Sequence, residues 1–267
     1  MTMTMTMTST LYRRGTIYSD AAPFATALLV VDGVVAWVGD EEGADVQRGT
    51  GGELTVHDLD GALLAPAFVD AVGTSGASPR ELAAVGIVAR LVDLDGNAAG
   101  TLESSAGPAA AADTGAEVNV GRGPWASAVR SSQMLAALAP GTVACLDPLE
   151  LPEVDLAAFA AAGVPLALGL ATPQGGPWSR VQHALALGLS ARAAFVAHTR
   201  GSWRASARPE GATLGRLHVG AAATFAVWEV QELVTQAASS QRSSWSLDAR
   251  SGLPPLPRLA PIGDDSW

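Results

Sequence analysis

A single carboxylate interrupts the apolar run Leu63-Leu64-Ala65-Pro66-Ala67-Phe68-Val69-Asp70-Ala71-Val72-Gly73-Thr74. A short apolar run of this kind is typical of a buried strand. We therefore expect a strand from Ala67 to Val72, with Asp70 as a hydrogen-bond acceptor at the strand end. The pattern changes across this segment: the residues before it are typical of antiparallel β-structure, and those after it alternate between short strands and helices.

Several strands are predicted before this segment. The residues from Leu11 to Ser19 alternate loosely and indicate one strand. The runs Ala27–Val31 and Val34–Gly39 flank Asp32-Gly33, a pair that supplies the positive φ angles of a two-residue hairpin turn. A further strand is expected at Leu54–Asp58, after a glycine-rich loop. Together these segments predict a small antiparallel sheet.

The residues from about 65 to 200 predict alternating strands and alanine-rich helices. The expected strands are Ala67 to Val72, Ile87 to Leu94, Thr142 to Leu146 and Val164 to Leu168. The expected helices are Pro79 to Val85, Pro124 to Ala137, Pro152 to Ala162, Trp178 to Leu187 and Ala191 to Thr199. Three of these helices are predicted to begin at proline, which the first helical turn accepts.

The remaining segments are simpler. Residues 97–117 are rich in Gly, Ala and Ser and are expected to be a surface linker. Gly215–Gly220 is flanked by turns, and a strand is expected at Thr224–Glu229. The proline-rich tail is expected to contain no regular element. Residues 1–8 repeat Met-Thr, lack the apolar core of a signal peptide, and are expected to be disordered.

The charge and the basic residues exclude several functions. The 267 residues carry a net charge of −10, which argues against nucleic acid or an anionic membrane as a partner. Every basic residue is arginine, so Schiff-base chemistry, a phosphate-loop lysine and a carbamylated-lysine metal bridge are excluded. The lone Cys145 cannot form an intrachain disulfide, and we expect a cytoplasmic protein in which Cys145 is a buried apolar residue.

The segment around Asp70 resembles the first barrel strand of the amidohydrolase superfamily, which reads Leu-x-Pro-Gly-Phe-Val-Asp-x-His-x-His. Asp32–Gly39 and Asp58–Gly61 precede it in the family's order. Further along, Gly163–Gly169 resembles the final barrel strand of the YtcJ-like branch. Ala197–Arg204, together with residues 215–228, is similar to that branch's closing helix and sandwich strands. The resemblance implies a metal-dependent hydrolase built from a barrel and a β-sandwich.

The resemblance fails where the family's chemistry lies. The family's two histidines are replaced by Val72 and Thr74. Valine cannot bind a metal, and the threonine hydroxyl is a poor substitute for imidazole. The family's Gly-Ser-Asp-Ser-Pro, whose aspartate is a metal ligand and proton shuttle, is replaced by Gly169–Pro173, with Ala171 at the aspartate position. No candidates for two further histidines occur between Val72 and Gly169. The stretch from Ala65 to Arg200 is also too short for the eight strand–helix units of a complete barrel.

The resemblance therefore implies an α/β plus β fold, in which both chain ends build a small β-sandwich around an incomplete (β/α) barrel remnant. The expected domains are a disordered start at 1–8, a composite sandwich from 9–64 and 205–235, a truncated barrel-like segment at 65–204, and a proline-rich tail at 236–267.

Other chemistry finds little support. The four histidines, His57, His183, His198 and His218, show no paired metal-ligand spacing, and each is more simply a surface or capping residue. Gly73–Ala77 is one residue short of a nucleophile elbow, and its serine and glycines are explained by a loop before Pro79. The scattered tryptophans are interpreted as packing anchors.

Two functional hypotheses follow. The first is a pseudoenzyme that binds a small molecule or a protein, has no metal or cofactor, and forms a homo-oligomer or pairs with a related full-length subunit. No catalytic, cofactor-binding or metal-binding residue is assigned, and Asp70 and His198 are the remaining candidates for a catalytic role. The second is a hydrolase acting on non-peptide C–N bonds, with zinc held by an atypical set such as Asp70, His183 and His198.

Overall fold

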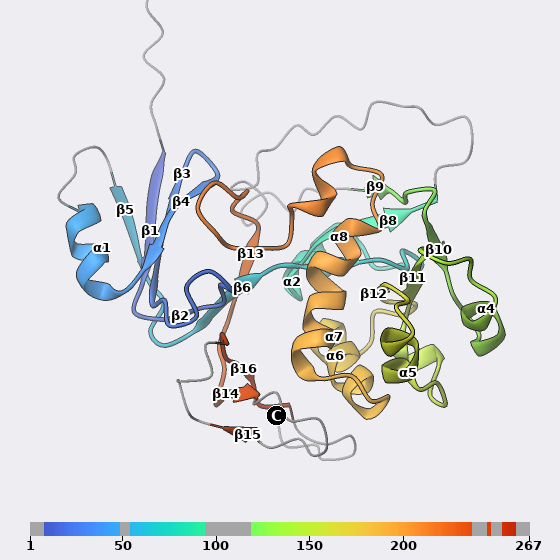
Figure 1. Ribbon diagram of the computed structural model, residues 1–267. Coiled ribbons are helices and arrows are strands. Elements are labelled where there is room, and N and C mark those ends of the chain that lie inside the picture. Colours follow the sequence, from blue (N-terminus) through green and yellow to red (C-terminus); the bar gives the residue numbers. More distant parts are fainter. Residues whose placement is uncertain (1–7, 49–53, 94–118, 237–244, 247–252, 260–267) are drawn as a thin grey trace, which may run out of the picture. The chain divides into compact units, whose positions relative to one another are not determined.

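The computed structural model describes residues 8–48, 54–93, 119–236, 245–246 and 253–259. The expected linker, the first seven residues and most of the proline-rich tail lie outside the described residues. The chain divides into two compact units (Figure 1). One contains the described residues up to Pro66 and those from Arg216 to Arg258, and the other contains Ala67 to Gly215 and Leu259.

The first unit is built around a four-stranded sheet. Its order is β4 (Val34–Gly39), β3 (Ala27–Val31), β1 (Ser9–Arg13) and β5 (Leu54–Asp58). The hairpin between β3 and β4 confirms the prediction from Asp32-Gly33, because φ is 47° at Asp32 and 76° at Gly33. The prediction of an entirely antiparallel sheet was wrong, since β5 pairs parallel to β1.

A helix that the sequence did not indicate explains this parallel pairing. Helix α1 (Glu41–Arg48) lies in the connection between β4 and β5 and returns the chain, so that β5 runs in the same direction as β4 and β1. Its buried Ala44 packs against Leu11 and Leu29 of the sheet. Arg13 of β1 forms an ion pair with Glu41 at 2.7 Å, which fixes the first turn of the helix.

Strands from both chain ends pair in a second sheet of the same unit. Strand β6 (Leu63–Pro66) lies between β13 (Phe225–Trp228), which is antiparallel to it, and the parallel β2 (Thr16–Ile17). The core of the unit combines residues of both sheets, namely Ile17, Ala25, Leu28, Val30, Val35, Leu59, Ala62, Leu64, Leu217 and Ala223.

A third small sheet corrects the expectation for the tail. Strand β14 (Leu233–Gln236) pairs with β15 (Trp245–Ser246) and β16 (Leu256–Pro257). Leu256 is buried, so its apolar contacts stabilise a short strand even beside proline. The tail therefore contains a regular element.

The second unit contains two sets of three parallel strands. Strands β7 (Phe68–Asp70), β8 (Ile87–Val92) and β9 (Asn119–Gly121) form one set. Strands β10 (Ala126–Ala128), β11 (Val143–Leu146) and β12 (Leu166–Leu168) form the other. The Ala71 N–H donates to the Leu168 carbonyl at 3.2 Å and connects the ends of β7 and β12. Across the described residues the strands form several small sheets and no closed barrel.

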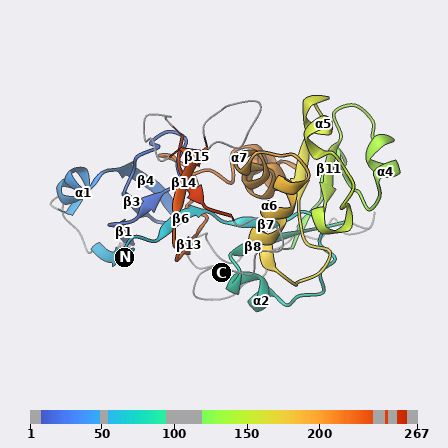
Figure 2. The ribbon, with the colours of Figure 1, turned by 90° about the horizontal axis from the view of Figure 1, so that it is seen from below.

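Most predicted helices of this unit are present with shifted ends. Helix α2 (Pro79–Ala84) begins with a capping box of Ser78 and Glu81. The remaining elements are η2 (Pro148–Glu150), α5 (Leu156–Ala161), α6 (Gly176–Ala186), α7 (Ala191–Val196), the π-helical η3 (Ala197–Gly201), α8 (Ser202–Arg204) and η4 (Pro209–Ala212). Helices α6 and α7 pack beside one another (Figure 2).

The prediction of one helix from Pro124 to Ala137 was wrong. Residues 126–128 form β10, and α4 (Ser132–Ala136) begins only after Ser131, whose side chain accepts a hydrogen bond from Met134 N at 3.2 Å. Pairing with β11 therefore prevails over helix propensity. Similarly, α5 begins after Asp155 rather than at Pro152. None of the described helices has the length and hydropathy needed to span a membrane.

Candidate functional site

Two buried carboxylates mark the carboxyl ends of the parallel strands. Asp70 is the last residue of β7, and Asp147 directly follows β11. The loop after β12, residues 169–172, lies between them, because it is hydrogen-bonded to both. In parallel α/β folds the carboxyl ends of the strands are where active sites are found. The chemistry of the chain is therefore best judged here.

Asp70 is fully buried, and backbone amides occupy one of its oxygens. Its Oδ1 accepts hydrogen bonds from the N–H groups of Val72, Gly73 and Leu170 at 3.0, 2.9 and 2.8 Å. Its Oδ2 lies 3.7 Å from the guanidinium Nε of Arg90. Burial raises the pKa of Asp70 above its usual range, against the lowering effect of these amides and of Arg90. The prediction of a strand-end acceptor is confirmed.

A close backbone approach makes this arrangement possible. A Cβ atom at Gly169 would lie 2.2 Å from the Val72 nitrogen and 2.6 Å from Asp70 Oδ1. Only glycine allows the start of the loop after β12 to lie against the end of β7. Asp70 thus connects the two strand ends through their backbones.

Asp147 is held by a buried arginine. Its Oδ2 lies 3.0 Å from the Arg180 guanidinium, and neither side chain is exposed by more than 1%. Leu149 N donates to Asp147 Oδ1 at 3.0 Å, and Ala171 N donates to Oδ2 at 2.7 Å. Both carboxylate oxygens therefore already have donors, as a buried carboxylate requires.

Arg180 is anchored equally well on its other side. It reaches from α6 and donates to the carbonyl oxygens of Thr172 at 2.7 Å and of Gly176 at 3.3 Å, and also to that of Gln174. A fixed positive charge thus bridges Asp147 and the loop after β12.

His198 lies against β7, the strand that ends at Asp70. On η3 it is fully buried, packs against Phe68 with ring centroids 4.9 Å apart, and donates from Nδ1 to the Val69 carbonyl at 3.1 Å. This donation leaves the neutral ring with Nε2 unprotonated. Burial lowers the pKa of His198 to about 4, against the opposing effect of the bond to Val69. His198 is therefore a neutral packing residue at pH 7, and the interpretation of it as a surface or capping residue was wrong, because the packing of η3 against β7 buries its ring.

This pKa leads to a prediction about stability. Unfolding returns His198 to its ordinary pKa of about 6.5, so between that pH and pH 4 the unfolded chain binds the additional proton and stability falls as the pH falls. We expect this residue to lower the free energy of unfolding by roughly 2 kcal/mol when the pH falls from 7 to 5. Urea unfolding of wild type and His198→Gln at both pH values measures the difference. Equal pH dependence of the two proteins would contradict it.

The other predicted site residues are not brought together. His183 lies on α6, where its Nδ1 contacts the Ser179 carbonyl at 2.8 Å. Within the described ranges, no group of three His, Cys, Asp or Glu side chains is placed to hold a metal ion. The proposed set of Asp70, His183 and His198 is therefore not formed. Val72 is buried and Thr74 is exposed, and neither supplies imidazole.

Two other residues keep the simple interpretation given to them. Cys145 is buried in β11, and burial raises the pKa of its thiol to about 12, so it is not a nucleophile at neutral pH. Ser75 is buried in the loop before α2, where Arg90 donates to its hydroxyl at 3.5 Å.

Sequence reasoning missed Asp147 and Arg180. Asp147 ends the apolar run Val143–Leu146 just as Asp70 ends its own run, and this shared strand-end position was a usable signal. Arg180 carried no such signal, because its partner lies 33 residues away and the pair forms only when α6 packs on the strands.

Comparison with known proteins reveals a likeness at the level of the fold. No family model matches the sequence, and no curated protein matches it. The structure is similar to that of enamidase, described as a member of the amidohydrolase superfamily. The two share 14% identity over 88% of this chain and 89% of that chain, with a TM-score of 0.56. The fold is amidohydrolase-like.

Two further similarities are weaker. Escherichia coli guanine deaminase has a TM-score of 0.48 at 14% identity, over 84% of this chain and 89% of that chain. A metal-dependent hydrolase from Pyrococcus horikoshii is 31% identical, but over only 31% of this chain and 17% of that chain, with a TM-score of 0.20. Because folds of this kind host many functions, function must be argued from the site.

Proposed function

We propose that this chain is a non-catalytic protein with an amidohydrolase-like fold that acts by binding a ligand or a protein. One observation carries the proposal: consecutive amides of the loop after β12 bind the two strand-end carboxylates. Leu170 N donates to Asp70, and Ala171 N donates to Asp147. These bonds use Oδ1 of Asp70 and Oδ2 of Asp147 in the region where the resemblance places a metal and an attacking water, and so support the proposal.

The residues at the site do not fit a catalytic metal. Asp70 uses Oδ1 for three amides, and Asp147 is neutralised by Arg180. A divalent ion at Asp147 would have to displace a buried guanidinium and leave it without its counter-charge, which is strongly unfavourable. At Ala171, where the resemblance implies an aspartate, only the backbone amide contributes.

Binding remains available to such a scaffold. Strand β10 is an edge strand of the sheet that it forms with β11 and β12. The nearby Trp125 and Met134 are 48% and 44% exposed. Exposed apolar side chains beside a sheet edge favour association. A second copy of this chain, or a related full-length subunit, is the partner we propose for this edge. The lone buried Cys145 fits the reducing cytoplasm that we propose as its compartment.

Turnover measurements test the proposal. The full chain, purified with added zinc, is assayed on a panel of acyclic amides, cyclic amides and aminopurines beside the Asp70→Asn variant. We expect both proteins to give only the background rate. Zinc-dependent turnover that Asp70→Asn abolishes would contradict the proposal and support instead a metal-dependent hydrolase of non-peptide C–N bonds.

A further inference from the structure

A pocket opens at the end of the strands opposite to Asp70 and Asp147. Its volume is about 220 Å³, and it lies where β11 begins at Val143 and β12 begins at Leu166. Its walls come from these strand starts, from α5, and from the helical segments between α7 and α8. Apart from two arginines and a glycine, every residue that lines the pocket has an apolar side chain.

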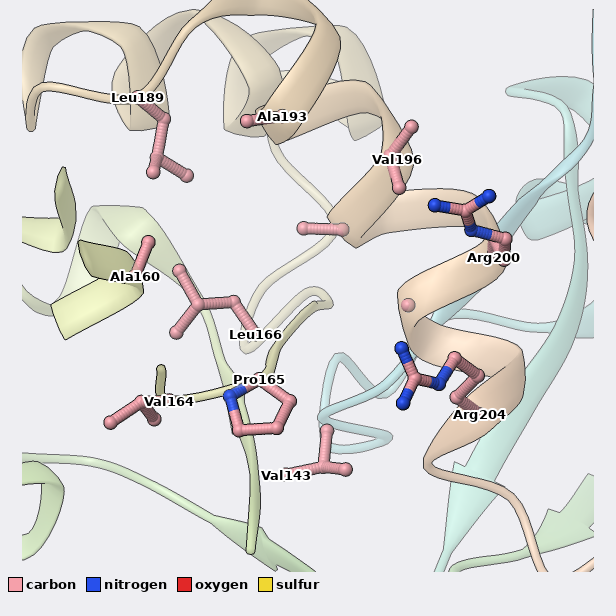
Figure 3. A pocket seen from close by; sticks show the side chains of 12 residues that line it. Val143, Ala160, Val164, Pro165, Leu166, Leu189, Ala193, Val196, Arg200 and Arg204 are labelled. Carbon is pink, nitrogen blue, oxygen red and sulfur yellow. The ribbon is translucent and has the colours of Figure 1, made fainter. Parts of the chain in front are cut away.

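Small residues leave this space open. Ala160 of α5, Ala193 of α7 and Ala197 of η3 all line the pocket, and none has a side chain that extends beyond Cβ. Figure 3 shows Ala160 and Ala193 beside the larger Leu189 and Leu166. Because protein interiors are normally close-packed, alanine at these positions leaves room that larger side chains would fill.

The pocket leads from the surface toward the core. Ala160 and Ala193 are exposed, whereas Val143 and Leu189 are only 5% and 8% exposed. Water that enters such a space finds few hydrogen-bond partners, because most of the lining is apolar. Replacing poorly held water by an apolar molecule is favourable.

The local backbone shapes one wall of the pocket. Residues 197–201 form a π-helical turn, a feature that is rare and found mostly at functional sites, and Ala197, Arg200 and Gly201 of this turn line the pocket. A Cβ atom at Gly201 would lie 2.6 Å from the Leu166 carbonyl oxygen, so glycine lets the turn lie directly on the start of β12. Close backbone packing of this kind holds the wall in place without a ligand.

We propose that this pocket binds a neutral, largely apolar aromatic molecule. A cavity of about 150 Å³ accommodates benzene, so this one suits a molecule of roughly nine non-hydrogen atoms, the size of indole. Figure 3 shows the guanidinium group of Arg204 at one side of the pocket, and a guanidinium favours the face of an aromatic ring over a saturated group.

The same lining disfavours a charged ligand. A carboxylate taken from water needs a partner of opposite charge, and Arg200 already makes an interaction within the protein. The remainder of the lining offers mostly apolar surface. A neutral ring therefore fits this pocket better than an anion of the same size.

This inference deepens the proposed binding function and rests on it for its biological meaning. The two fail in different experiments, because hydrolysis depends on the strand-end carboxylates whereas this binding depends on the opposite end of the strands. An active hydrolase could still bind indole here, and an inactive chain could fail to bind it.

Calorimetric titration of the full chain tests the inference with two probes of equal size, indole and benzoate. We expect indole to bind with a dissociation constant on the order of 0.1–1 mM, the range for a ligand of this size. Benzoate is expected to bind at least about tenfold more weakly, because its carboxylate loses water on entering the pocket.

A filling variant locates the site. Ala193→Leu places a larger apolar side chain in the pocket wall and keeps a strong helix former, so we expect it to fold and to weaken indole binding at least about tenfold. Ala158→Leu makes the same change at an exposed position of α5 outside the lining and is expected to have no effect. Thermal unfolding of both variants checks that each is folded.

Sedimentation of the full chain with and without indole tests whether a side chain of a second copy fills the pocket instead. We expect indole to leave the mass of the particle unchanged. A shift from dimer to monomer would overturn the proposal and identify the pocket as a protein interface. Absence of indole binding, equal binding of benzoate, or equal effects of the two leucine variants would each overturn it as well.

Discussion

Arg180→Leu is expected to lower the free energy of unfolding by about 3–5 kcal/mol, because it leaves the carboxylate of Asp147 buried without its counter-charge. The side chains of Arg180 and Asp147 are each exposed by no more than 1%, and their closest atoms are 3.0 Å apart. The substitution also removes the donors to the carbonyl oxygens of Thr172 and Gly176. Urea unfolding monitored by circular dichroism measures the loss.

A surface pair provides the matched control. Arg208 forms an ion pair with Glu210 at 2.8 Å, but the two side chains are 32% and 47% exposed. Arg208→Leu should therefore cost no more than about 1 kcal/mol. The double variant Asp147→Ala, Arg180→Leu should lose less stability than the sum of its single variants, since neither charge is then left alone. Equal losses for Arg180→Leu and Arg208→Leu would show that the buried pair does not hold the strand ends.

Asp70→Ala is expected to destabilise the chain by about 3–5 kcal/mol, because three backbone N–H groups lose their common acceptor. Those of Val72 and Leu170 are buried with it. The Arg90 guanidinium, 3.7 Å from Asp70, also loses a nearby negative charge. Thermal and urea unfolding of the variant measure the effect.

Two comparisons separate the acceptor from its charge. Asp70→Asn keeps a carbonyl oxygen for the three amides, so it should cost less than half as much as Asp70→Ala. Asp155→Ala removes a helix cap that accepts a single exposed bond, from Ala158 N at 2.9 Å, and should cost about 1 kcal/mol. If Asp70→Ala cost no more than Asp155→Ala, Asp70 would not be the residue that joins β7 to the loop after β12.

Local chemistry explains which parts of the fold could be predicted. The Asp32-Gly33 turn and the proline that opens α2, Pro79, act over a few residues, so the sequence alone indicated the hairpin and the start of α2. Helix α1 was missed because it is short and polar, and the residue that it buries, Ala44, is small. Its presence then determined the parallel direction of β5.

Tertiary contacts explain what could not be predicted. Proline at position 124 favoured a helix, but pairing with β11 gave β10 instead. For the site, Asp70 was recognisable as a strand-end acceptor. Its partner Leu170 is 100 residues away, and the pairing of Asp147 with Arg180 likewise depends on how the elements pack. Such partners become visible only when the strands and α6 are placed together.

Metal content tests the central claim most directly. The full-length chain is purified after growth with added zinc, and its metals are measured by mass spectrometry beside those of Asp70→Asn. Because backbone amides occupy Oδ1 of Asp70 and Arg180 neutralises Asp147, we expect almost no zinc in either protein. Stoichiometric zinc in the wild-type chain that Asp70→Asn removes would contradict this account and identify a metal site at the strand ends.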